Sequence, residues 1–171
     1  MLLVVCDATP LIYLAKLGRF DLLHKLHEEV LVPPAVWQEV AVQGASFPEG
    51  AAIRQAAEDG WLQIEKPKGQ LPATAKERED LDPGEEEAIQ LAIERSALLV
   101  IDEAHGREVA LRLQVRITGT IGLLIRSKIE GLLPSLRVEL DRLCAETTFR
   151  LSASVYNEAL RAVGESSKSS S

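Results

Sequence analysis

The chain has 171 residues and a net charge of −7, and it is 46% hydrophobic and 26% charged, as ordinary globular proteins are. This length suits a single domain with a substantial core. No apolar run approaches the roughly 20 residues that span a bilayer, so we expect no membrane association. The acidity argues against a protein that merely coats nucleic acid, because phosphate contacts need basic residues. It leaves open an enzyme whose metal ions supply the positive charge.

Two further features indicate a cytoplasmic protein. No basic segment precedes the N-terminal apolar stretch, which argues against a secretory signal peptide. Cys6 and Cys144 lie far apart in the sequence, as is typical of reduced structural thiols.

The first half of the chain alternates short apolar strands with helices. Residues 2–6 form a predicted buried strand, and Thr9 and Pro10 have the pattern of an N-cap and a first helical residue. Gly18 then ends this helix. The remaining predicted elements of this half are helices at 20–27, 34–43 and 51–59, and strands at 30–33 and 61–65.

The second half begins with a change of composition at residues 66–82, where two prolines, a glycine and alternating charges predict a loop or partly disordered excursion. A strand-like segment and a final helix, capped by Ser152 or Ser154, are predicted within residues 149–165. The Ser-rich residues 166–171 are predicted to be a disordered tail outside a single domain at 1–165. The elements predicted in between are helices at 83–95, 103–113, 118–133 and 134–144, and strands at 97–101 and 115–117.

Short apolar strands that alternate with helices predict an α/β fold with a parallel sheet covered on both faces. In such sheets, functional side chains gather beyond the carboxyl ends of the strands. Asp7 and Asp102 each follow a predicted strand, so both are expected at one edge. If the strands are neighbours, the two carboxylates raise each other's pKa or require a cation. Capping of the next helix is an equal alternative for Asp102, whereas Thr9 already fills that position after Asp7.

Two predicted helices carry further acidic candidates. Glu85 stands in DPGEEEAIQLA, where Asp82 and Glu85 also fit a capping box, a purely structural role. Glu85 nevertheless shares a face with the apolar stripe, at the sheet-facing end of the helix. Glu87 points about 200° away from it and is expected to face solvent. Glu39 lies in VWQEV on a mostly apolar helix, with a solvated surface glutamate as the alternative.

Several stretches resemble the PIN-domain ribonucleases, and within them a compact prokaryotic group related to VapC-type toxins of toxin–antitoxin pairs. They are, in order, VVCDATPLIYLAKLGRFDLL, VLVPPAVWQEV, LDPGEEEAIQLA, LLVIDEAHGREVA and ITGTIGLLIRSKIEGLLP. They cover most of residues 3–134, and RLSASVYNEALRAVGE resembles the closing helix of that group. The resemblance implies a three-layer α/β/α fold with a central, mainly parallel sheet.

The resemblance also implies an acidic cluster that binds Mg²⁺ or Mn²⁺. The matching acidic positions in this sequence are Asp7, Glu39, Glu85 and Asp102. Glu87 stays open as an alternative third ligand, because GEEEA permits two alignments. Three threonines match polar positions that orient the metal ligands or the phosphate, with helix capping as their structural alternative: Thr9, Thr118 and Thr120. Ala8 removes a hydroxyl that relatives often have, while every acidic ligand is kept.

The function implied is metal-dependent hydrolysis of RNA that leaves a 5′-phosphate, with single-stranded or looped RNA as substrate. Arg107, Arg126 and Lys128 are candidates for contacts to the RNA backbone, with solvated helix charges as the alternative. A small antitoxin protein and a homodimer are the implied protein partners. A phosphatase with an aspartate after its first strand would need a second Asp at position 9, where this chain has Thr. A catalytically silent PIN-fold binding module remains the main alternative.

Overall fold

A five-stranded parallel sheet forms the centre of the computed structural model, which describes residues 3–166. The strand order is β3-β2-β1-β4-β5, and every neighbouring pair is parallel. The strands are β1 (Val4–Cys6), β2 (Val30–Val32), β3 (Leu62–Ile64), β4 (Leu98–Val100) and β5 (Ile117–Thr118). The sheet is therefore the parallel α/β sheet that the sequence pattern predicted.

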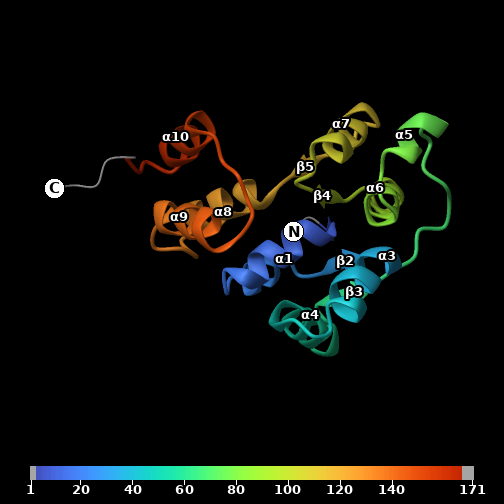
Figure 1. The fold of residues 1–171 in the computed structure, drawn as a ribbon, viewed down its shortest axis with the longest axis horizontal. Coiled ribbons are helices and arrows are strands. Elements are labelled where there is room, and N and C mark those ends of the chain that lie inside the picture. Colours follow the sequence, from blue (N-terminus) through green and yellow to red (C-terminus); the bar gives the residue numbers. More distant parts are fainter. Residues whose placement is uncertain (1–2, 167–171) are drawn as a thin grey trace.

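Helices cover the two faces of this sheet. Those of the first half are α1 (Ala8–Lys16), α2 (Asp21–Leu26), α3 (Pro34–Trp37), the π-helix η1 (Gln38–Gln43) and α4 (Pro48–Glu58). Those of the second half are α5 (Ala75–Glu79), α6 (Pro83–Arg95), α7 (Ala104–Arg112), α8 (Thr120–Ile129), α9 (Leu136–Glu146) and α10 (Ala153–Ala162). Figure 1 shows α8 and α9 on one side of the strands and α5 and α6 on the other.

The alternation of side chains along β1 divides the core into two layers. Val4 and Cys6 belong to one buried cluster, together with residues of α1, α2, α4, α8 and α9. Val5 belongs to a second cluster, with residues of α6 and α7. Strands buried on both faces need apolar residues throughout, which explains the unbroken hydrophobic runs in the sequence. The fold is a three-layer α/β/α sandwich.

The register of β1 and β4 fixes the edge where the site lies. Cys6 pairs with Val100, and the N–H of Asp7 donates to the Val100 carbonyl at 3.0 Å. The carboxyl ends of parallel strands meet at one edge, so the residues that follow β1 and β4 lie side by side there. Asp7 and Asp102 therefore occupy the same edge of the sheet.

The helix after β1 begins two residues earlier than predicted. Asp7, not Thr9, is its N-cap residue, and Ala8 is its first helical residue. The backbone of Asp7 is extended, with φ −77° and ψ 167°, so the strand passes directly into the helix. The local preference of Thr9 for an N-cap is overridden by the last strand hydrogen bond, which the N–H of Asp7 makes.

Three other elements differ from the predictions. The helix at 34–43 changes to π-helical hydrogen bonding at Gln38. A short helix, α5, interrupts the predicted loop, because Thr74 and Glu77 form a capping box that the charged composition concealed. The segment just before Ser152 joins no strand within residues 3–166, although Ser152 does cap α10 as predicted. Most of the predicted tail, residues 167–171, lies outside the described residues.

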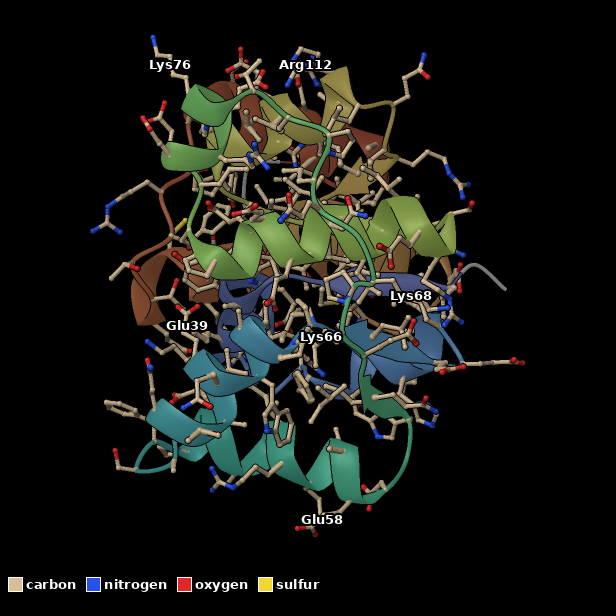
Figure 2. The ribbon with its side chains drawn as sticks, turned by 90° about the vertical axis from the view of Figure 1, so that its right-hand side faces the viewer. Glu39, Glu58, Lys66, Lys68, Lys76 and Arg112 are labelled. Atoms are coloured by element: carbon tan, nitrogen blue, oxygen red, sulfur yellow. The ribbon has the colours of Figure 1, made fainter. Side chains whose placement is uncertain are left out.

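The segment between β3 and α5 is held against α6. Figure 2 shows the chain that carries Lys66 and Lys68 crossing this helix. The N–H groups of Lys68 and Gly69 donate to the Glu94 carboxylate at 2.9 and 2.7 Å. These contacts order a segment whose composition alone indicated disorder.

Cys6 and Cys144 are both free thiols, as the sequence predicted. Burial and the neighbouring Asp7 and Asp102 charges raise the pKa of the Cys6 thiol well above its ordinary value. None of the helices within residues 3–166 combines the length and apolar character needed to cross a membrane.

Candidate active site

Asp7 is the most deeply buried of the acidic candidates, with 4% of its surface exposed. Burial raises its pKa to about 7, and the hydrogen bond from the Ala8 N–H opposes that rise. The nearby carboxylates of Asp82, Glu85 and Glu39 add like charge and raise the pKa further. A buried acid among other acids is poorly solvated when ionised, so this position favours a proton or a cation.

Glu85 combines the two roles that the sequence left open. Its Oε2 accepts the Asp82 N–H at 3.0 Å, and Asp82 Oδ1 accepts the Glu85 N–H at 2.7 Å, which completes a capping box. The side chain is also buried, at 5% exposure. Burial raises its pKa to about 7 against the hydrogen bond from the Asp82 backbone, and the charge of Asp82 adds to the rise.

The neighbouring Glu103 carboxylate further raises the pKa of Glu85. Glu103 is the N-cap residue of α7, and its Oε2 accepts the Gly106 N–H at 2.8 Å. The N-terminal ends of α6 and α7 thus bring two carboxylates near each other.

Glu87 has a different task from Glu85. Its Oε2 accepts the N–H of Ala35 at 2.8 Å, in the first turn of α3. The prediction that Glu87 faces solvent is wrong, because α3 packs against this side of α6 and leaves the side chain half-buried. With its carboxylate satisfying the α3 N-terminus, Glu87 is less suited than Glu85 as the third acidic ligand.

Asp82 joins the candidate site although the sequence pointed only to its capping role. Its charge raises the pKa of three neighbours: Asp7, Glu39 and Glu85. Gly84 leaves room for close packing here, since a Cβ there would lie 3.2 Å from Val36 Cγ2 and 3.3 Å from Asp82 Oδ1. The signal for it in the sequence is a glycine in the first turn of a helix, where it weakens the helix unless close contact requires it.

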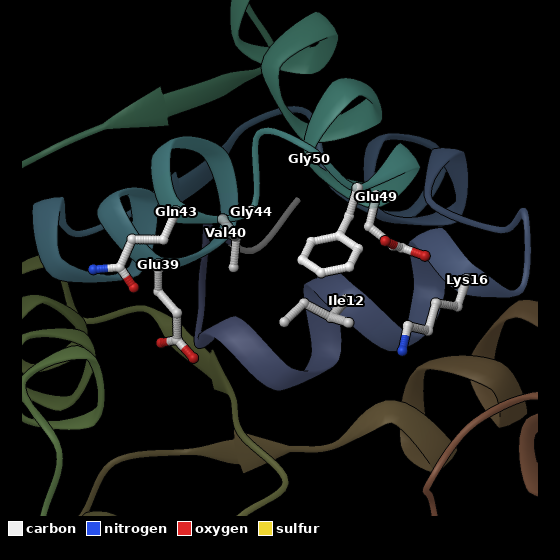
Figure 3. Close-up of a pocket in the computed structure, with 9 residues that line it drawn as sticks. Ile12, Lys16, Glu39, Val40, Gln43, Gly44, Glu49 and Gly50 are labelled. Carbon is white, nitrogen blue, oxygen red and sulfur yellow. The ribbon is translucent and has the colours of Figure 1, made fainter.

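Glu39 approaches the same group from the π-helix η1. Its side chain is exposed, and its pKa is raised by partial burial of the carboxylate and by the charge of Asp82. A cavity of about 410 Å³ opens between Glu39, Asp82 and Gly84. Figure 3 shows Glu39 and Gln43 extending from one helix at the end of a second groove. π-Helical turns are frequent at functional sites, which fits this placement.

Asp102 is anchored to the start of α8. Its Oδ1 accepts the Thr120 N–H at 2.8 Å, and its Oδ2 accepts the Thr120 hydroxyl at 2.6 Å. Burial raises the pKa of Asp102, while the Thr120 hydrogen bonds and the Arg107 charge lower it. The alternative that Asp102 caps the helix directly after it does not hold, because Glu103 occupies that position.

Arg107 lies beside Asp102, unlike the other basic candidates. Its Nη1 donates to the Ile101 carbonyl at 2.8 Å. A Cβ at Gly119 would come within 2.6 Å of Asp102 Oδ1 and 3.1 Å of Arg107 Nη1, so the three residues border one small space. The two basic candidates of α8 make other contacts: Arg126 pairs with Glu130 at 2.9 Å, and Lys128 donates to the Pro134 carbonyl at 2.8 Å.

The three candidate threonines differ in burial and in hydrogen bonding. Thr120 is fully buried and binds Asp102. Thr9 is half-buried as the second residue of α1, and Thr118 is half-buried in β5. Among the hydrogen bonds of residues 3–166, only that of Thr120 joins a candidate threonine to a candidate acid.

The donor set suits a hard divalent cation by its chemistry, since Mg²⁺ and Mn²⁺ prefer carboxylate oxygens. Burial, and then repulsion from neighbouring carboxylates, raises the pKa values of Asp7 and Glu85, and a cation beside them would stabilise their ionised forms. Within the described residues, however, no group of three or more acidic, His or Cys side chains is close enough together to hold a metal ion.

The sequence profile of a family described as a PIN domain matches residues 3–165 of this chain. The match includes every strand of the sheet and all helices from α1 to α10. No curated protein matches the chain.

Proposed function

Since this chain belongs to the PIN-domain family, whose members are generally nucleases, we propose that it is a metal-dependent endoribonuclease that hydrolyses RNA phosphodiester bonds. The observation that carries the proposal is electrostatic: Asp7, Glu39 and Glu85 all lie near the negative charge of Asp82. Burial and like charge raise the pKa of each of these carboxyl groups at the carboxyl edge of the sheet. A structural protein gains nothing from such repulsion, whereas a cation-binding enzyme uses it.

The ligands proposed for Mg²⁺ or Mn²⁺ are Asp7, Glu39, Glu85 and Asp102. A divalent ion held by these residues would supply an activated water and charge stabilisation for hydrolysis of the phosphodiester, and the product would carry a 5′-phosphate. Thr120 holds the Asp102 carboxylate in one orientation through two hydrogen bonds. Asp82 adds negative charge beside the ligands and thereby strengthens attraction for the cation.

The proposed substrate is single-stranded or looped RNA, because unpaired bases can be splayed into protein pockets. We further propose that the protein is the toxin of a toxin–antitoxin pair, acts in the cytoplasm, forms a homodimer and is covered by a small antitoxin. These proposals rest on the resemblance of its sequence to the VapC-type group.

Cleavage of labelled RNA in Mn²⁺ tests the proposal. Wild-type protein should cleave, and Asp7→Asn and Asp102→Asn should each abolish cleavage while keeping the fold, as judged by circular dichroism. Asp59→Asn is the matched control, because Asp59 is exposed at the end of α4 and bonds Gln55. Wild-type protein that is stabilised by Mn²⁺ but cleaves no RNA would instead identify the catalytically silent binding module.

A further inference from the structure

In addition to the cavity at Glu39 and the groove of Figure 3, another pocket lies beside Asp102, at the β5 end of the sheet. It has a volume of about 410 Å³ and opens beside β5, the edge strand of the sheet. The residues that matter for its chemistry are Asp102, Arg107, Ile117, Ile121, Phe149 and Val155. They come from the β4–α7 region, from β5 and α8, from the segment before α10 and from α10 itself.

One wall of this pocket carries a positioned cation. One N–H of Arg107 donates to the Ile101 carbonyl. Within residues 3–166, Arg107 makes no ion pair with a carboxylate. The planar guanidinium keeps further donors free for a bidentate acceptor such as a phosphate. The neighbouring Asp102 carboxylate already accepts two hydrogen bonds, from the N–H and the hydroxyl of Thr120.

A second part of the lining is apolar and consists of Ile117, Ile121, Phe149 and Val155. Phe149 packs edge to face against Tyr13, with ring centroids 5.3 Å apart and an interplanar angle of 76°. A fixed aromatic ring beside aliphatic side chains is a surface on which a nucleobase packs.

The groove on the other side of the site has a different charge. It measures about 340 Å³ and is lined by the carboxylates of Glu39 and Glu49 with a single lysine, Lys16. A phosphate is repelled there and attracted to the Arg107 wall. Charge therefore selects the pocket beside Asp102 for the backbone of a nucleic acid.

We propose that the pocket beside Asp102 binds one unpaired nucleotide of the RNA substrate, adjacent to the bond that is cut. Arg107 contacts its phosphate, and the wall formed by Ile117, Ile121, Phe149 and Val155 receives its base. This inference rests on the proposed ribonuclease function, and it adds the residues that position the strand.

Two valines provide a matched pair of variants. Val155 lines the pocket and is 42% exposed, while Val138 lies on α9 outside the pocket lining and is 49% exposed. Each is the third residue of its helix, and its N–H donates to the N-cap serine, Ser152 or Ser135. Glutamate is favoured at this position, so Val155→Glu and Val138→Glu add the same charge without destabilising either helix.

The measurement is binding of a short labelled single-stranded RNA in EDTA, where no metal-dependent cleavage occurs. Val155→Glu should weaken binding about tenfold, because it places a carboxylate where the base packs. Val138→Glu should bind as the wild-type protein does. Equal binding by the two variants, or no binding by the wild-type protein, overturns the subsite.

Arg107→Gln tests the phosphate contact. It should reduce the salt dependence of RNA binding by about one unit of log–log slope. Arg112→Gln, on the same helix but paired with Glu77, should leave that slope unchanged. A loss of folding stability without a change of slope in Arg107→Gln would show a purely structural arginine.

The two proposals fail separately. A protein that binds RNA through Val155 and Arg107 in EDTA, but never cleaves it in Mn²⁺, retains the subsite and refutes the nuclease. A protein that cleaves RNA while both valine variants bind it equally retains the nuclease and refutes the subsite.

Discussion

Asp7 and Asp102 follow neighbouring parallel strands at one edge of the sheet, yet the two carboxylates differ in their hydrogen bonds and in the charges around them. Asp102 receives a backbone N–H and a hydroxyl from Thr120, and Arg107 adds a favourable charge. Asp7 receives one backbone N–H and otherwise faces like charges. The ends of two neighbouring strands thus carry one carboxylate that is anchored by hydrogen bonds and one whose ionised form is destabilised by burial and like charge. In the proposed metal site, the first would fix the geometry and the second would supply affinity for the cation.

The largest effect is expected from Asp7→Asn. Losing a metal ligand removes several kcal/mol of transition-state stabilisation, which lowers the cleavage rate by about a hundredfold or more. In EDTA at pH 8 the same variant should be more stable than the wild-type protein, because it removes a buried charge whose pKa is raised to about 7. Cleavage assays and urea unfolding measure the two effects. A variant that is both inactive and less stable would contradict the claim that the ionised Asp7 carboxylate destabilises the folded protein.

The second comparison is between Glu85 and Glu87, two residues apart on α6. Glu85→Gln should lower cleavage by about a hundredfold if Glu85 is a metal ligand. Glu87→Gln should keep near-wild-type cleavage but lose roughly 1 kcal/mol of stability, because it weakens the charge-assisted hydrogen bond to the Ala35 N–H. Rates in Mn²⁺ and unfolding in urea separate these outcomes. The reverse pattern would make Glu87 the ligand.

The third prediction concerns stability against pH in EDTA. The folded-state pKa values of Asp7 and Glu85, about 7 each, lie above their unfolded values of 3.8 and 4.5. Between about pH 4 and 7 the folded state therefore binds more protons than the unfolded state, and these groups make stability fall as the pH rises. We expect a decrease of about 2 kcal/mol or more across this window. Unfolding in urea at several pH values measures it.

Saturating Mn²⁺ should recover most of this loss at pH 7 to 8, because the cation binds the ionised carboxylates of the folded state. Asp7→Asn should flatten the pH dependence in EDTA. A pH profile that Mn²⁺ leaves unchanged would argue against a cation site at these residues.

The smallest effect is expected on the anchored side, from Thr120→Val. This change keeps the side-chain shape and the backbone N–H but removes the hydroxyl that donates to Asp102 at 2.6 Å. The pKa of Asp102 should rise, since this hydrogen bond lowers it, and the acid limb of the pH–rate profile should move to higher pH. Near neutral pH we expect about tenfold slower cleavage.

Ser127→Ala is the matched control for Thr120→Val. It removes another buried hydroxyl from α8, one that donates to the Leu123 carbonyl within the helix. A similar loss of stability in both variants with a shifted pH profile only in Thr120→Val would establish that Thr120 acts through Asp102.

The sequence predicted much of the architecture because the relevant signals are local. The bounds of α6 were correct, since Asp82, Pro83 and Arg95 carry the start and stop signals of that helix. The start of α1 was wrong, because strand pairing at Asp7 overrides the preference of Thr9 for an N-cap. The helix α5 was missed, although Thr74 and Glu77 carry its capping signal.

The candidate site was less accessible to sequence reasoning. The group of neighbouring carboxylates includes Asp82, for which the sequence predicted only a helix-capping role. Glu87 is less suited than Glu85 as a ligand because it accepts the N–H of Ala35, which lies 52 residues away in the chain. No local pattern reveals a hydrogen bond of that range, because both partners are ordinary residues in their own segments.

By itself the sequence determined the alternation of apolar strands with helices, and hence the parallel sheet and the edge where carboxylates collect. That much follows from hydrophobic burial and helix capping, which act between residues close in the chain. Tertiary structure alone decided that Asp7 is destabilised when ionised, that Asp102 is anchored by Thr120 and that Arg107 lies beside it. Desolvation and charge act through space, so their effects exist only once distant segments have packed together.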